Sequence, residues 1–481
     1  MVMGELTLDT EVLVIGGGPG GYAAAFRAAD LGMDVTMVDM AERPGGECLF
    51  RGCIPSKTLL HLAEILHDAR RAESMGITFP EPDIDIGKIR EHKNKVIDQL
   101  ANGLVSLSEK RGIQRIKGKA VFESSNKARI YESDTGHIRF KQAIIATGSS
   151  AVGLPGTEFK KNGRIINSSG ALELPDIPGS MLIVGGGYVG LEIGSVYAAL
   201  GSRIVLLERG KQLMTGVDPD IVKPLRSRLE GLFEKIHYNT SIESLREEET
   251  EVVASFNTES GLEDRSFDRV LVAIGREPNS MDIGLENTKV TVDDKGFIQV
   301  DKQMRTSDPN IYAVGDVVGG YMLAHKAHRE GKVAAEAIAG KPTVFDARVI
   351  PAIVFTLPQV AWCGLTEEQA LKEDRRIKVQ RFFWQHSGRA VTMGAPEGLT
   401  KMIIDPDTER IEGAGFSGRD TEGLIAEAVL AIEMGALVQD IALTVHAHPT
   451  LSETEAEVAE IFLGSATHFL SREVKGGQVK R

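Results

Sequence analysis

The sequence predicts an α/β protein in which one strand–turn–helix–strand unit occurs twice and a separate α+β domain follows. Residues 11–40 run from an apolar strand through a glycine-rich turn and an alanine-rich helix into a second strand, and residues 181–209 repeat this order. From about residue 349 the pattern changes to alternating apolar strands and then helices. A chain of 481 residues is long enough for these three parts.

The two repeats match position by position. The matching positions are Gly16, Gly18, Gly21 and Asp39 in the first repeat and Gly185, Gly187, Gly190 and Glu208 in the second. Glycines at this spacing let a pyrophosphate approach a helix N-terminus, and the acid accepts a hydrogen bond from a ribose hydroxyl. One such motif is weak evidence, but two in matching context are strong. We expect two dinucleotides, FAD and a nicotinamide, placed for hydride transfer.

Strands that end in glycine turns mark the domain crossings, at residues 141–156 and 268–280. A further buried strand, residues 311–318, ends in Gly-Asp and places Asp316 to reach a cofactor hydroxyl, although a simple turn aspartate would look the same. The predicted domains are a FAD-binding domain in two parts (1–150 and 279–348), a NAD-binding domain (151–278) and a C-terminal domain (349–481).

Composition excludes several classes of partner. The net charge is −13 with the acids spread along the chain, so no basic stripe is available for nucleic acid or an anionic membrane. Residues 1–18 show no basic segment followed by an apolar one, and no apolar run reaches about 18 residues. We expect a cytoplasmic protein without nucleic-acid or membrane partners.

Two of the three cysteines, Cys48 and Cys53, stand close together in the stretch GGECLFRGCIPSK at residues 45–57. In a reducing compartment a close pair indicates a metal site or a redox site, not a structural disulfide. A zinc site would need further ligands such as His61 and His67, and the chain has no second cysteine pair. Redox chemistry is therefore favoured, and no metal site is assigned.

An ideal helix would hold the Cα atoms of Cys48 and Cys53 about 8 to 9 Å apart, beyond the roughly 7 Å that a disulfide tolerates. The segment must therefore distort, which Gly46 and Gly52 permit. Pro55 suits the first turn of a following helix, whose positive end would stabilise a thiolate on Cys53. The alternative is that both cysteines are ordinary thiols buried in the core, without redox chemistry.

These motifs, together with ATG at residues 146–148, VGD at 314–316 and HAHPTLSE at 446–453, resemble the flavin-dependent pyridine nucleotide–disulfide oxidoreductases over nearly the whole chain. Within that family the chain looks most like the dihydrolipoyl dehydrogenases, whose usual active-site string is GGTCLNVGCIPSK. Glu47, Phe50 and Arg51 depart from that string. They flank the cysteines and do not replace them.

The resemblance implies that protein-bound dihydrolipoyl groups are oxidised through Cys48 and Cys53 and FAD, with hydride passed to NAD. The implied partners are the lipoyl-bearing acyltransferase (E2) or carrier proteins of 2-oxo acid dehydrogenase or glycine cleavage complexes, and a second copy of the chain in a homodimer formed through the C-terminal domain. A role in cell redox homeostasis goes with this activity. Cys48 would exchange with substrate, and Cys53 would be the thiolate beside the flavin.

The resemblance also assigns the acid–base catalyst, His448, contributed by the partner subunit and oriented by Glu453. From spacing alone, Thr450 to Glu453 equally predicts a helix capping box, and both roles are compatible. Lys57 and Glu192 would pair near the flavin, although a solvated lysine and a surface acid are the simpler interpretations. His446 is interpreted as structural and Cys363 as a buried small apolar residue.

The cofactor-binding residues that the resemblance implies are Gly16, Gly18, Gly21, Asp39, Met40, Gly45, Gly46, Lys57, Ala120, Thr147, Gly148, Asp316, Ala324, Gly185, Gly187, Tyr188, Val189, Gly190, Glu208, Ala273, Gly275 and Arg276. Glu208 favours NAD because an acid repels the 2′-phosphate of NADP, although Arg209 stands beside it.

Two alternatives stay open at this point. Tyr188 stands where lipoyl dehydrogenases usually carry an aliphatic residue and glutathione reductases a tyrosine, so a glutathione-reductase-like NAD(P)H-dependent disulfide reductase is the runner-up. The other alternative is a docking subunit of a multienzyme complex whose redox activity is incidental. The two cysteines, the histidine and both glycine motifs argue against it.

Overall fold

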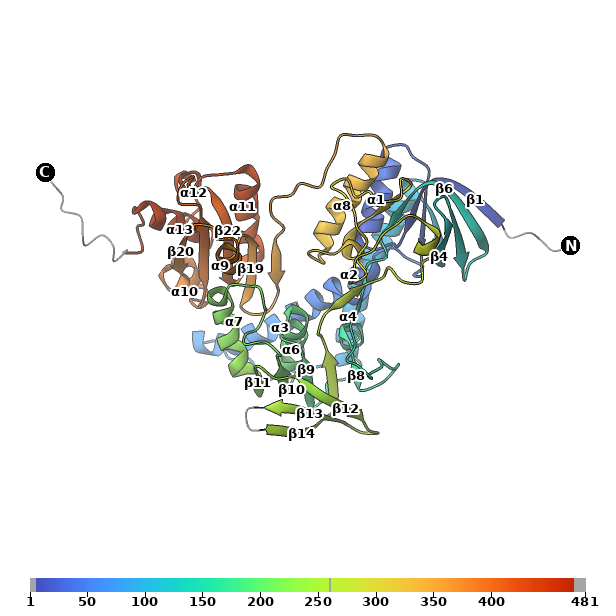
Figure 1. Cartoon of the computed structure of the whole chain (residues 1–481). Helices are drawn as coiled ribbons and strands as arrows, with labels where there is room; N and C mark the ends of the chain where they lie inside the picture. Colours follow the sequence, from blue (N-terminus) through green and yellow to red (C-terminus); the bar gives the residue numbers. More distant parts are fainter. Residues whose placement is uncertain (1–5, 259–260, 471–481) are drawn as a thin grey trace. The chain divides into compact units, whose positions relative to one another are not determined.

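The computed structural model describes residues 6–258 and 261–470, which form two compact units (Figure 1). The first unit comprises residues up to 65 together with 69–177 and 270–346, and the second comprises 66–68, 178–269 and the residues from 347 onward. Residues 1–5, part of the stretch behind the predicted cytoplasmic location, lie outside the described residues. The mixed α/β class and the separate C-terminal α+β domain are confirmed.

The first unit is built on a seven-stranded sheet in the order β3-β2-β1-β6-β5-β4, with β17 also paired to β6. Strands β1, β2, β3 and β17 run parallel to their neighbours, whereas β4, β5 and β6 form an antiparallel extension. The strands of this unit are β1 (Leu6–Ile15), β2 (Val35–Asp39), β3 (Gln114–Lys117), β4 (Lys119–Ser124), β5 (Lys127–Tyr131), β6 (Thr135–Ile145), β7 (Ser149–Ala151), β8 (Ile165–Ile166), β15 (Arg269–Val272), β16 (Arg276–Pro278) and β17 (Ile311–Ala313).

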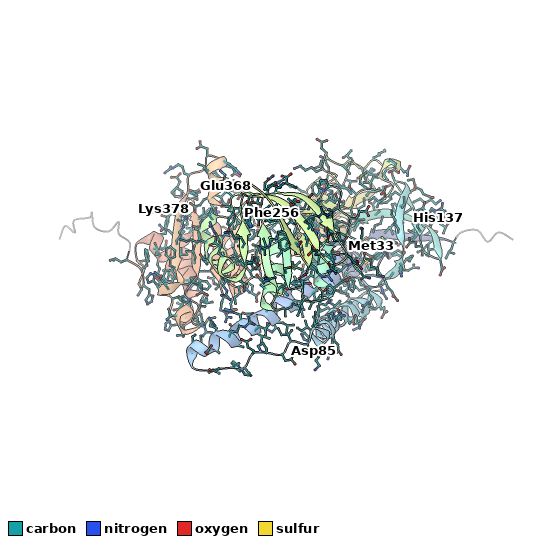
Figure 2. The ribbon with its side chains drawn as sticks, turned by 90° about the horizontal axis from the view of Figure 1, so that it is seen from below. Met33, Asp85, His137, Phe256, Glu368 and Lys378 are labelled. Atoms are coloured by element: carbon teal, nitrogen blue, oxygen red, sulfur yellow. The ribbon has the colours of Figure 1, made fainter. Side chains whose placement is uncertain are left out.

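Helices cover this sheet and carry the cysteines. They are α1 (Pro19–Asp30), α2 (Gly46–Arg51), α3 (Cys53–Arg71), α4 (Ile86–Lys110), α5 (Ser168–Leu172) and α8 (Ala324–Ile338). Helices α1 and α8 lie side by side, so close that a Cβ on Gly331 would overlap the carbonyl oxygen of Gly20 (Figure 1). Asp85 caps the start of α4 by accepting a hydrogen bond from the amide of Lys88 at 3.0 Å (Figure 2).

In the second unit, the second repeat forms the parallel strands β9, β10 and β11, and a three-stranded antiparallel sheet, β12-β13-β14, follows. The bounds are β9 (Ser180–Val184), β10 (Arg203–Leu207), β11 (Lys235–His237), β12 (Ile242–Glu247), β13 (Val252–Thr258), β14 (Gly261–Phe267), α6 (Tyr188–Ala199) and α7 (Pro219–Leu232). Strands β9 and β10 are apolar and almost wholly buried, as both faces of a parallel sheet require.

The rest of the second unit is an antiparallel sheet in the order β18-β19-β22-β21-β20 with helices packed on it. Its elements are β18 (Ala352–Val354), β19 (Gln359–Gly364), β20 (Lys378–Phe383), β21 (Leu399–Ile404), β22 (Ile411–Gly418), α9 (Glu367–Lys372), α10 (Gly388–Thr392), α11 (Thr421–Met434), α12 (Val438–Leu443) and α13 (Glu453–Leu463). Trp384 is fully buried, and Gly398 and Gly418 leave the space its indole ring occupies.

No helix within residues 6–258 and 261–470 combines the length and the apolarity that crossing a membrane requires. The cytoplasmic location stays a prediction.

A buried ion-pair network joins α7 to the C-terminal sheet. Lys401 on β21 is only 1% exposed, and its Nζ lies 2.7 Å from Asp218 and 2.9 Å from Asp220 and also pairs with Glu367. Arg381 pairs with Asp220 and Glu367. Burial alone would raise the pKa of Asp220, but Lys401 and Arg381 outweigh it and hold that pKa below its usual value. The three carboxylates therefore surround an ammonium group.

We expect Lys401→Met to lower the free energy of unfolding by about 3 to 5 kcal/mol, because three clustered carboxylates would remain with Arg381 alone. Urea unfolding at neutral pH measures the change. The matched control is Lys372→Met, since Lys372 pairs with Glu368 at the surface, and it should cost no more than about 1 kcal/mol. Equal losses in the two variants would contradict the importance of the buried network.

Candidate active site

Both glycine turns have the tight backbone that the repeat predicts. Gly16 and Gly185 adopt positive φ values of 103° and 112°. A Cβ on Gly21 would overlap the carbonyl oxygen of Gly16, and a Cβ on Gly190 would overlap that of Gly185. These close contacts bring each helix N-terminus directly against the end of its preceding strand, which is how this fold presents free amides to a phosphate.

The acid at the end of the second strand is held in the same way in both repeats. Asp39 accepts hydrogen bonds from the amides of Gly17 at 2.5 Å and Ala41 at 2.6 Å. Glu208 accepts from the amides of Gly186 at 2.8 Å and Gly210 at 2.5 Å. Both carboxylates are thereby fixed in orientation before any ribose binds.

Sequence analysis missed the middle glycine of each motif, Gly17 and Gly186. A Cβ at Gly186 would lie 2.8 Å from the Glu208 carboxylate, and one at Gly17 would lie 3.2 Å from that of Asp39. The signal was present in the sequence, since both motifs read Gly-Gly-Gly, but only the folded turn shows that the middle residue meets the acid.

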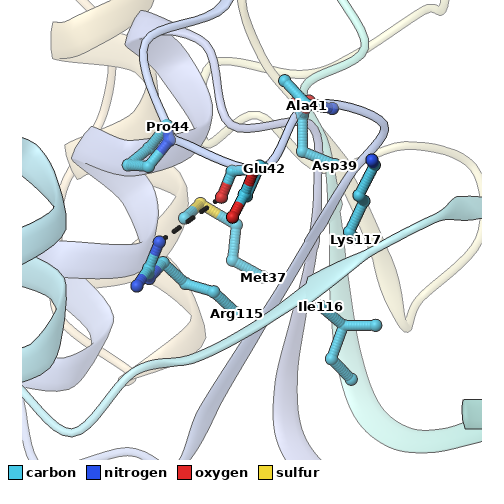
Figure 3. Close-up of a pocket in the computed structure, with 8 residues that line it drawn as sticks. All are labelled: Met37, Asp39, Ala41, Glu42, Pro44, Arg115, Ile116 and Lys117. Atoms are coloured by element: carbon cyan, nitrogen blue, oxygen red, sulfur yellow. Dashed lines mark hydrogen bonds between the residues drawn. The ribbon is translucent and has the colours of Figure 1, made fainter. Parts of the chain in front are cut away.

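A cavity of about 220 Å³ opens beside Asp39 at the carboxyl ends of β2 and β3 (Figure 3). Its lining residues are Met37, Asp39, Ala41, Glu42, Pro44, Arg115, Ile116 and Lys117. Arg115 donates a hydrogen bond to the carbonyl oxygen of Glu42 at 3.4 Å across it (Figure 3). This is the side of a parallel sheet where nucleotides bind, and a carboxylate with a basic wall suits the adenosine end of a dinucleotide.

Gly18 and Gly187 leave open space where a pyrophosphate would approach. A Cβ on Gly187 meets nothing within 4 Å, and one on Gly18 meets only the Cα of Gly46, at 3.9 Å. Each is the N-cap of its helix, with no side-chain cap bond to its amides. The surrounding protein would accept a side chain at these two positions, so a ligand that needs the space explains why both are glycine.

The cysteine segment breaks into two helices, as the sequence predicted. Helix α2 ends at Arg51, Gly52 adopts φ −134° and ψ −108°, and α3 begins at Cys53. The structure has both cysteines as thiols and not as a disulfide. The hydrogen bond with Cys53, followed by burial, raises the pKa of Cys48, and Lys57 offsets this only in part. Cys48 therefore holds its proton more firmly than an ordinary thiol, whereas Cys53 begins α3, whose positive end favours a thiolate.

The redox segment starts directly on the first glycine turn. The amide of Gly45 donates to the carbonyl oxygen of Gly17 at 2.7 Å. A Cβ on Gly46 would lie 2.6 Å from the Cα of Gly18. Gly45 and Gly46 both have positive φ, at 143° and 58°. The two glycine segments thus touch backbone to backbone, and this contact puts the thiols beside the dinucleotide turn.

Asp316 is held by Ser149, and residues from two further segments of the first unit support this contact. Its carboxylate accepts from the hydroxyl of Ser149 at 2.5 Å, and Arg276 donates to Ser149 Oγ at 2.7 Å and to its carbonyl oxygen at 2.6 Å. Glu330 on α8 accepts from the amide of Gly315 at 2.8 Å. Ser149 was not singled out from the sequence, although it directly follows Thr147-Gly148.

The two crossing segments pair with each other in an antiparallel ladder, β7 with β16, which the sequence did not indicate. Thr147 and Asn279 exchange hydrogen bonds at 2.7 and 2.9 Å across the same junction. Among the other predicted contacts of the first unit, Lys57 lies on α3, Ala324 begins α8, Ala120 is buried in β4 and Met40 is largely exposed.

In the second unit, the predicted nicotinamide-side residues lie on α6. Tyr188 is the first residue of the helix and is 43% exposed, next to Val189. Glu192 is only 3% exposed and accepts a hydrogen bond from the amide of Phe355 at 2.9 Å. The simpler interpretation of Glu192 as a surface acid is therefore wrong. Ala273, Gly275 and Arg276 belong to the first unit.

His448 and Glu453 form the predicted pair. His448 Nδ1 lies 2.8 Å from Glu453 Oε1, and Glu453 Oε2 accepts from the amide of Thr450 at 2.8 Å. Glu453 thus binds both the turn before α13 and the imidazole. The predicted capping box is not formed, because Ser452 is the N-cap of α13 and no side-chain hydrogen bond caps the helix. Burial alone would raise the pKa of Glu453, but the Thr450 amide and His448 outweigh it and lower that pKa. With Nδ1 bonded and the ring 75% exposed, Nε2 is the atom left for proton transfer.

The proposed zinc alternative finds no support among the described residues. His61 is largely exposed beside Glu64, and His67 Nδ1 lies 2.8 Å from Arg228. Within residues 6–258 and 261–470, only Asp218, Asp220 and Glu367 come together as possible metal ligands, and Lys401 occupies that cluster. His446 pairs with Glu427 at 2.9 Å, as a structural residue would.

A buried carboxyl group, Glu455, lies two residues after Glu453. Burial, followed by the nearby charge of Glu427, raises the pKa of Glu455 well above its usual value. Burial and the charge of Glu455 raise the pKa of Cys363 to about 12, so this thiol is protonated as well. Cys363 is 2% exposed, which agrees with its interpretation as a buried apolar residue.

We expect Gly187→Ala to weaken NAD binding at least tenfold while leaving the unfolding temperature unchanged, because the added methyl group enters only ligand space. Gly190→Ala is the contrasting variant and should lower the unfolding temperature, since its methyl group overlaps the Gly185 carbonyl. Calorimetric NAD titration and thermal unfolding separate the two effects. If Gly187→Ala binds NAD as tightly as the unchanged protein does, the assignment of this turn to NAD binding is contradicted.

We expect Glu455→Gln to stabilise the protein, and more so as pH rises. The pKa of Glu455 is higher in the folded state, so the stability it contributes is present below about pH 4.3 and is lost as pH rises toward the folded-state pKa. Thermal unfolding at about pH 5 and about pH 8 measures the difference, with the exposed Glu368→Gln as control. A gain that does not grow with pH would show that Glu455 is ionised in the folded protein.

Known proteins are similar to this chain over nearly its whole length. A family model described as pyridine nucleotide-disulphide oxidoreductase matches residues 10–331, and the dimerisation domain of that family matches residues 350–459. The chain is 43% identical over 470 residues to a dihydrolipoyl dehydrogenase of Haemophilus influenzae, covering 97% of this chain and 98% of the relative. For a dihydrolipoyl dehydrogenase of Bacillus subtilis the identity is 41%, with 98% and 100% covered.

Solved structures agree. The HOCl-induced flavoprotein disulfide reductase RclA from Escherichia coli matches with a TM-score of 0.83 and 27% identity, covering 94% of this chain and 99% of that one. LpdA from Mycobacterium tuberculosis matches with a TM-score of 0.86 at 23% identity and shows the shared fold. FAD and NAD are the cofactors of this flavoprotein chemistry, which confirms both predictions. The chain belongs to the pyridine nucleotide-disulphide oxidoreductase family, and it carries that family's dimerisation domain.

Proposed function

We propose that the protein is a dihydrolipoyl dehydrogenase, which oxidises protein-bound dihydrolipoyl groups to the cyclic disulfide and passes the electrons to NAD. The observation that supports it best is identity of 41 to 43% over nearly the full length to relatives of that name. Cys48 and Cys53, on two helices that meet at Gly52, supply the matching chemistry.

The two glycine turns would hold the two dinucleotides. FAD would bind through the Gly16 turn, Asp39 and Asp316, and NAD through the Gly185 turn and Glu208. Bound FAD supplies a two-electron carrier between the cysteine thiols and NAD. A fixed carboxylate at Glu208 disfavours the 2′-phosphate of NADP. Lys57 and Glu192 would complete the flavin surroundings.

The cysteine pair would react by thiol–disulfide exchange. A substrate thiolate attacks Cys48 Sγ of the Cys48–Cys53 disulfide, forming a mixed disulfide and releasing Cys53 as a thiolate. The second substrate thiol then attacks the substrate sulfur of the mixed disulfide and releases Cys48. The substrate loses two electrons and two protons, and the enzyme disulfide becomes two thiols. The helix end at Cys53 suits its role as the thiolate released first, and the raised pKa of Cys48 means that Cys48 takes up a proton as it leaves.

His448 would take the proton of the attacking substrate thiol at Nε2, while Glu453 holds Nδ1 and stabilises the imidazolium that forms. We place this histidine at the cysteine pair of a second copy of the chain, so the homodimer would be required for activity. The dimerisation domain that contains His448 supports this arrangement. The partners would be lipoyl-bearing acyltransferases or carrier proteins of multienzyme complexes.

We expect Cys53→Ser to abolish NADH formation from dihydrolipoamide, because no enzyme disulfide can form. We expect His448→Gln to lower kcat by about 10²- to 10⁴-fold, the usual contribution of a general base. The control is His61→Gln, an exposed histidine with no assigned role, which should retain full activity. Full activity of His448→Gln would contradict the assigned base, and complex function in Cys53→Ser would favour the docking-subunit alternative.

A substrate comparison tests the whole proposal. The purified protein is mixed anaerobically with dihydrolipoamide and NAD, and in parallel with NADPH and glutathione disulfide, while the flavin spectrum and nicotinamide absorbance are recorded. A long-wavelength charge-transfer band with NADH formed in the first mixture supports the proposal. If only the second mixture turns over, the proposed substrate and the proposed role of Glu208 are wrong. The fold and the thiol chemistry would still hold.

A further inference from the structure

Helix α2, which carries Cys48, is short and weakly held by its own backbone. It has six residues, Gly46 to Arg51, and lies between residues with unusual backbone conformations at Gly45 and Gly52. A helix this short is unstable by itself in water, because nucleation costs more than its few hydrogen bonds return. Contacts from outside the helix must therefore fix its orientation.

Glu47, directly before Cys48, makes such contacts. Its Oε1 accepts a hydrogen bond from the hydroxyl of Ser169 at 2.9 Å, and Arg276 Nη1 lies 3.9 Å from the same oxygen. Arg51 Nε lies 3.8 Å from Oε2, within the same helix turn. Two of the three partners thus come from elements far from α2 in the sequence.

Both distant partners are themselves held in place. Arg276, on β16, makes two hydrogen bonds to Ser149, which in turn donates to Asp316. Ser169, on α5, follows Asn167, whose side chain caps that helix by accepting from the amide of Gly170 at 3.0 Å. Glu47 is therefore bound to two rigid points of the first unit, and one of them continues to the carboxylate of Asp316.

A second attachment of α2 runs through Phe50. The guanidinium of Arg43 lies 5.6 Å from the centroid of the Phe50 ring, and Arg43 pairs with Asp98 on α4 at 2.8 Å. Glu47 and Phe50 are two of the three departures from the family's usual active-site string. In this chain both therefore connect α2 to the surrounding fold.

We propose that Glu47 is a positioning residue for the Cys48–Cys53 pair: its carboxylate, held by Ser169 and Arg276, fixes α2 so that the two sulfur atoms stay within bonding reach. A fixed pair favours the disulfide over two separate thiols, because less freedom is lost when the bond closes. Glu47 thus makes the disulfide harder to reduce. This inference concerns the pair itself and does not depend on which disulfide or dithiol substrate the enzyme uses.

The test is a redox titration of the intact flavoprotein against mixtures of reduced and oxidised dithiothreitol. The protein disulfide gains two electrons and two protons to give two thiols, while dithiothreitol loses them and becomes its cyclic disulfide. Samples are quenched in acid, denatured and labelled with a maleimide, and mass spectrometry counts the labels. Cys363, which is not part of the pair, provides a constant label in every sample.

We expect Glu47→Ala to shift this equilibrium about tenfold toward the thiols, equivalent to a potential about 30 mV less negative. Glu47→Gln keeps an oxygen that accepts from Ser169 and should shift it less. Ser169→Ala removes only the donor and should shift it in the same direction, which keeps the test available if Glu47→Ala fails to fold. Glu11→Gln, at a surface pair with Lys141, is the control and should show no shift.

An unchanged equilibrium in both Glu47→Ala and Ser169→Ala would overturn the proposal. So would a lower unfolding temperature with no change in the potential, since that combination describes a structural residue only. Because no lipoyl substrate enters the titration, its failure would leave the proposed function untouched. Conversely, if the protein does not oxidise dihydrolipoyl groups, the expected shift of the thiol–disulfide equilibrium stays the same.

Discussion

The structure depends on one close contact between two glycine backbones. Gly46, at the start of the redox helix, has room for a hydrogen only, since a Cβ would lie 2.6 Å from the Cα of Gly18 in the dinucleotide turn. The hydrogen bond from Gly45 to Gly17 strengthens the contact. Because the turn presents its amides to a pyrophosphate and the redox helix carries Cys48, this one junction brings cofactor site and thiol site together.

Backbone amides also orient the acidic side chains of the candidate site. Asp39 and Glu208 each receive two backbone amides, so the protein fixes a carboxylate without using another side chain. Asp316 accepts from the Ser149 hydroxyl, and Glu453 is fixed by the Thr450 amide and the His448 ring. In each case the carboxylate is already oriented by the fold, which would lower the reorganisation required during binding or proton transfer.

The local environment gives side chains of the same type different pKa values and therefore different roles. Cys48 and Cys53 are both thiols, yet hydrogen bonding and burial keep the proton on the first, while the second begins a helix. Glu453 and Glu455 stand on the same helix, but amide and imidazole donors lower the pKa of one, and burial without a donor raises that of the other. Identical side chains thus have pKa values shifted in opposite directions, one as an orienting acid and the other within the core.

The sequence by itself determined the repeated dinucleotide fold and the broken helix at the cysteines, because each depends on residues close together in the chain. The pairing of His448 with Glu453 was implied by the family resemblance, since spacing alone predicted a helix cap equally well. Glycine spacing, a proline and a five-residue interval are local signals. Only the tertiary structure decided that Gly17 and Gly186 hold the acids, that Ser149 and Arg276 support Asp316, that Glu192 is buried and that Glu47 reaches Ser169. These contacts join segments 22 to 167 residues apart, and no local periodicity carries information about which distant side chains will meet.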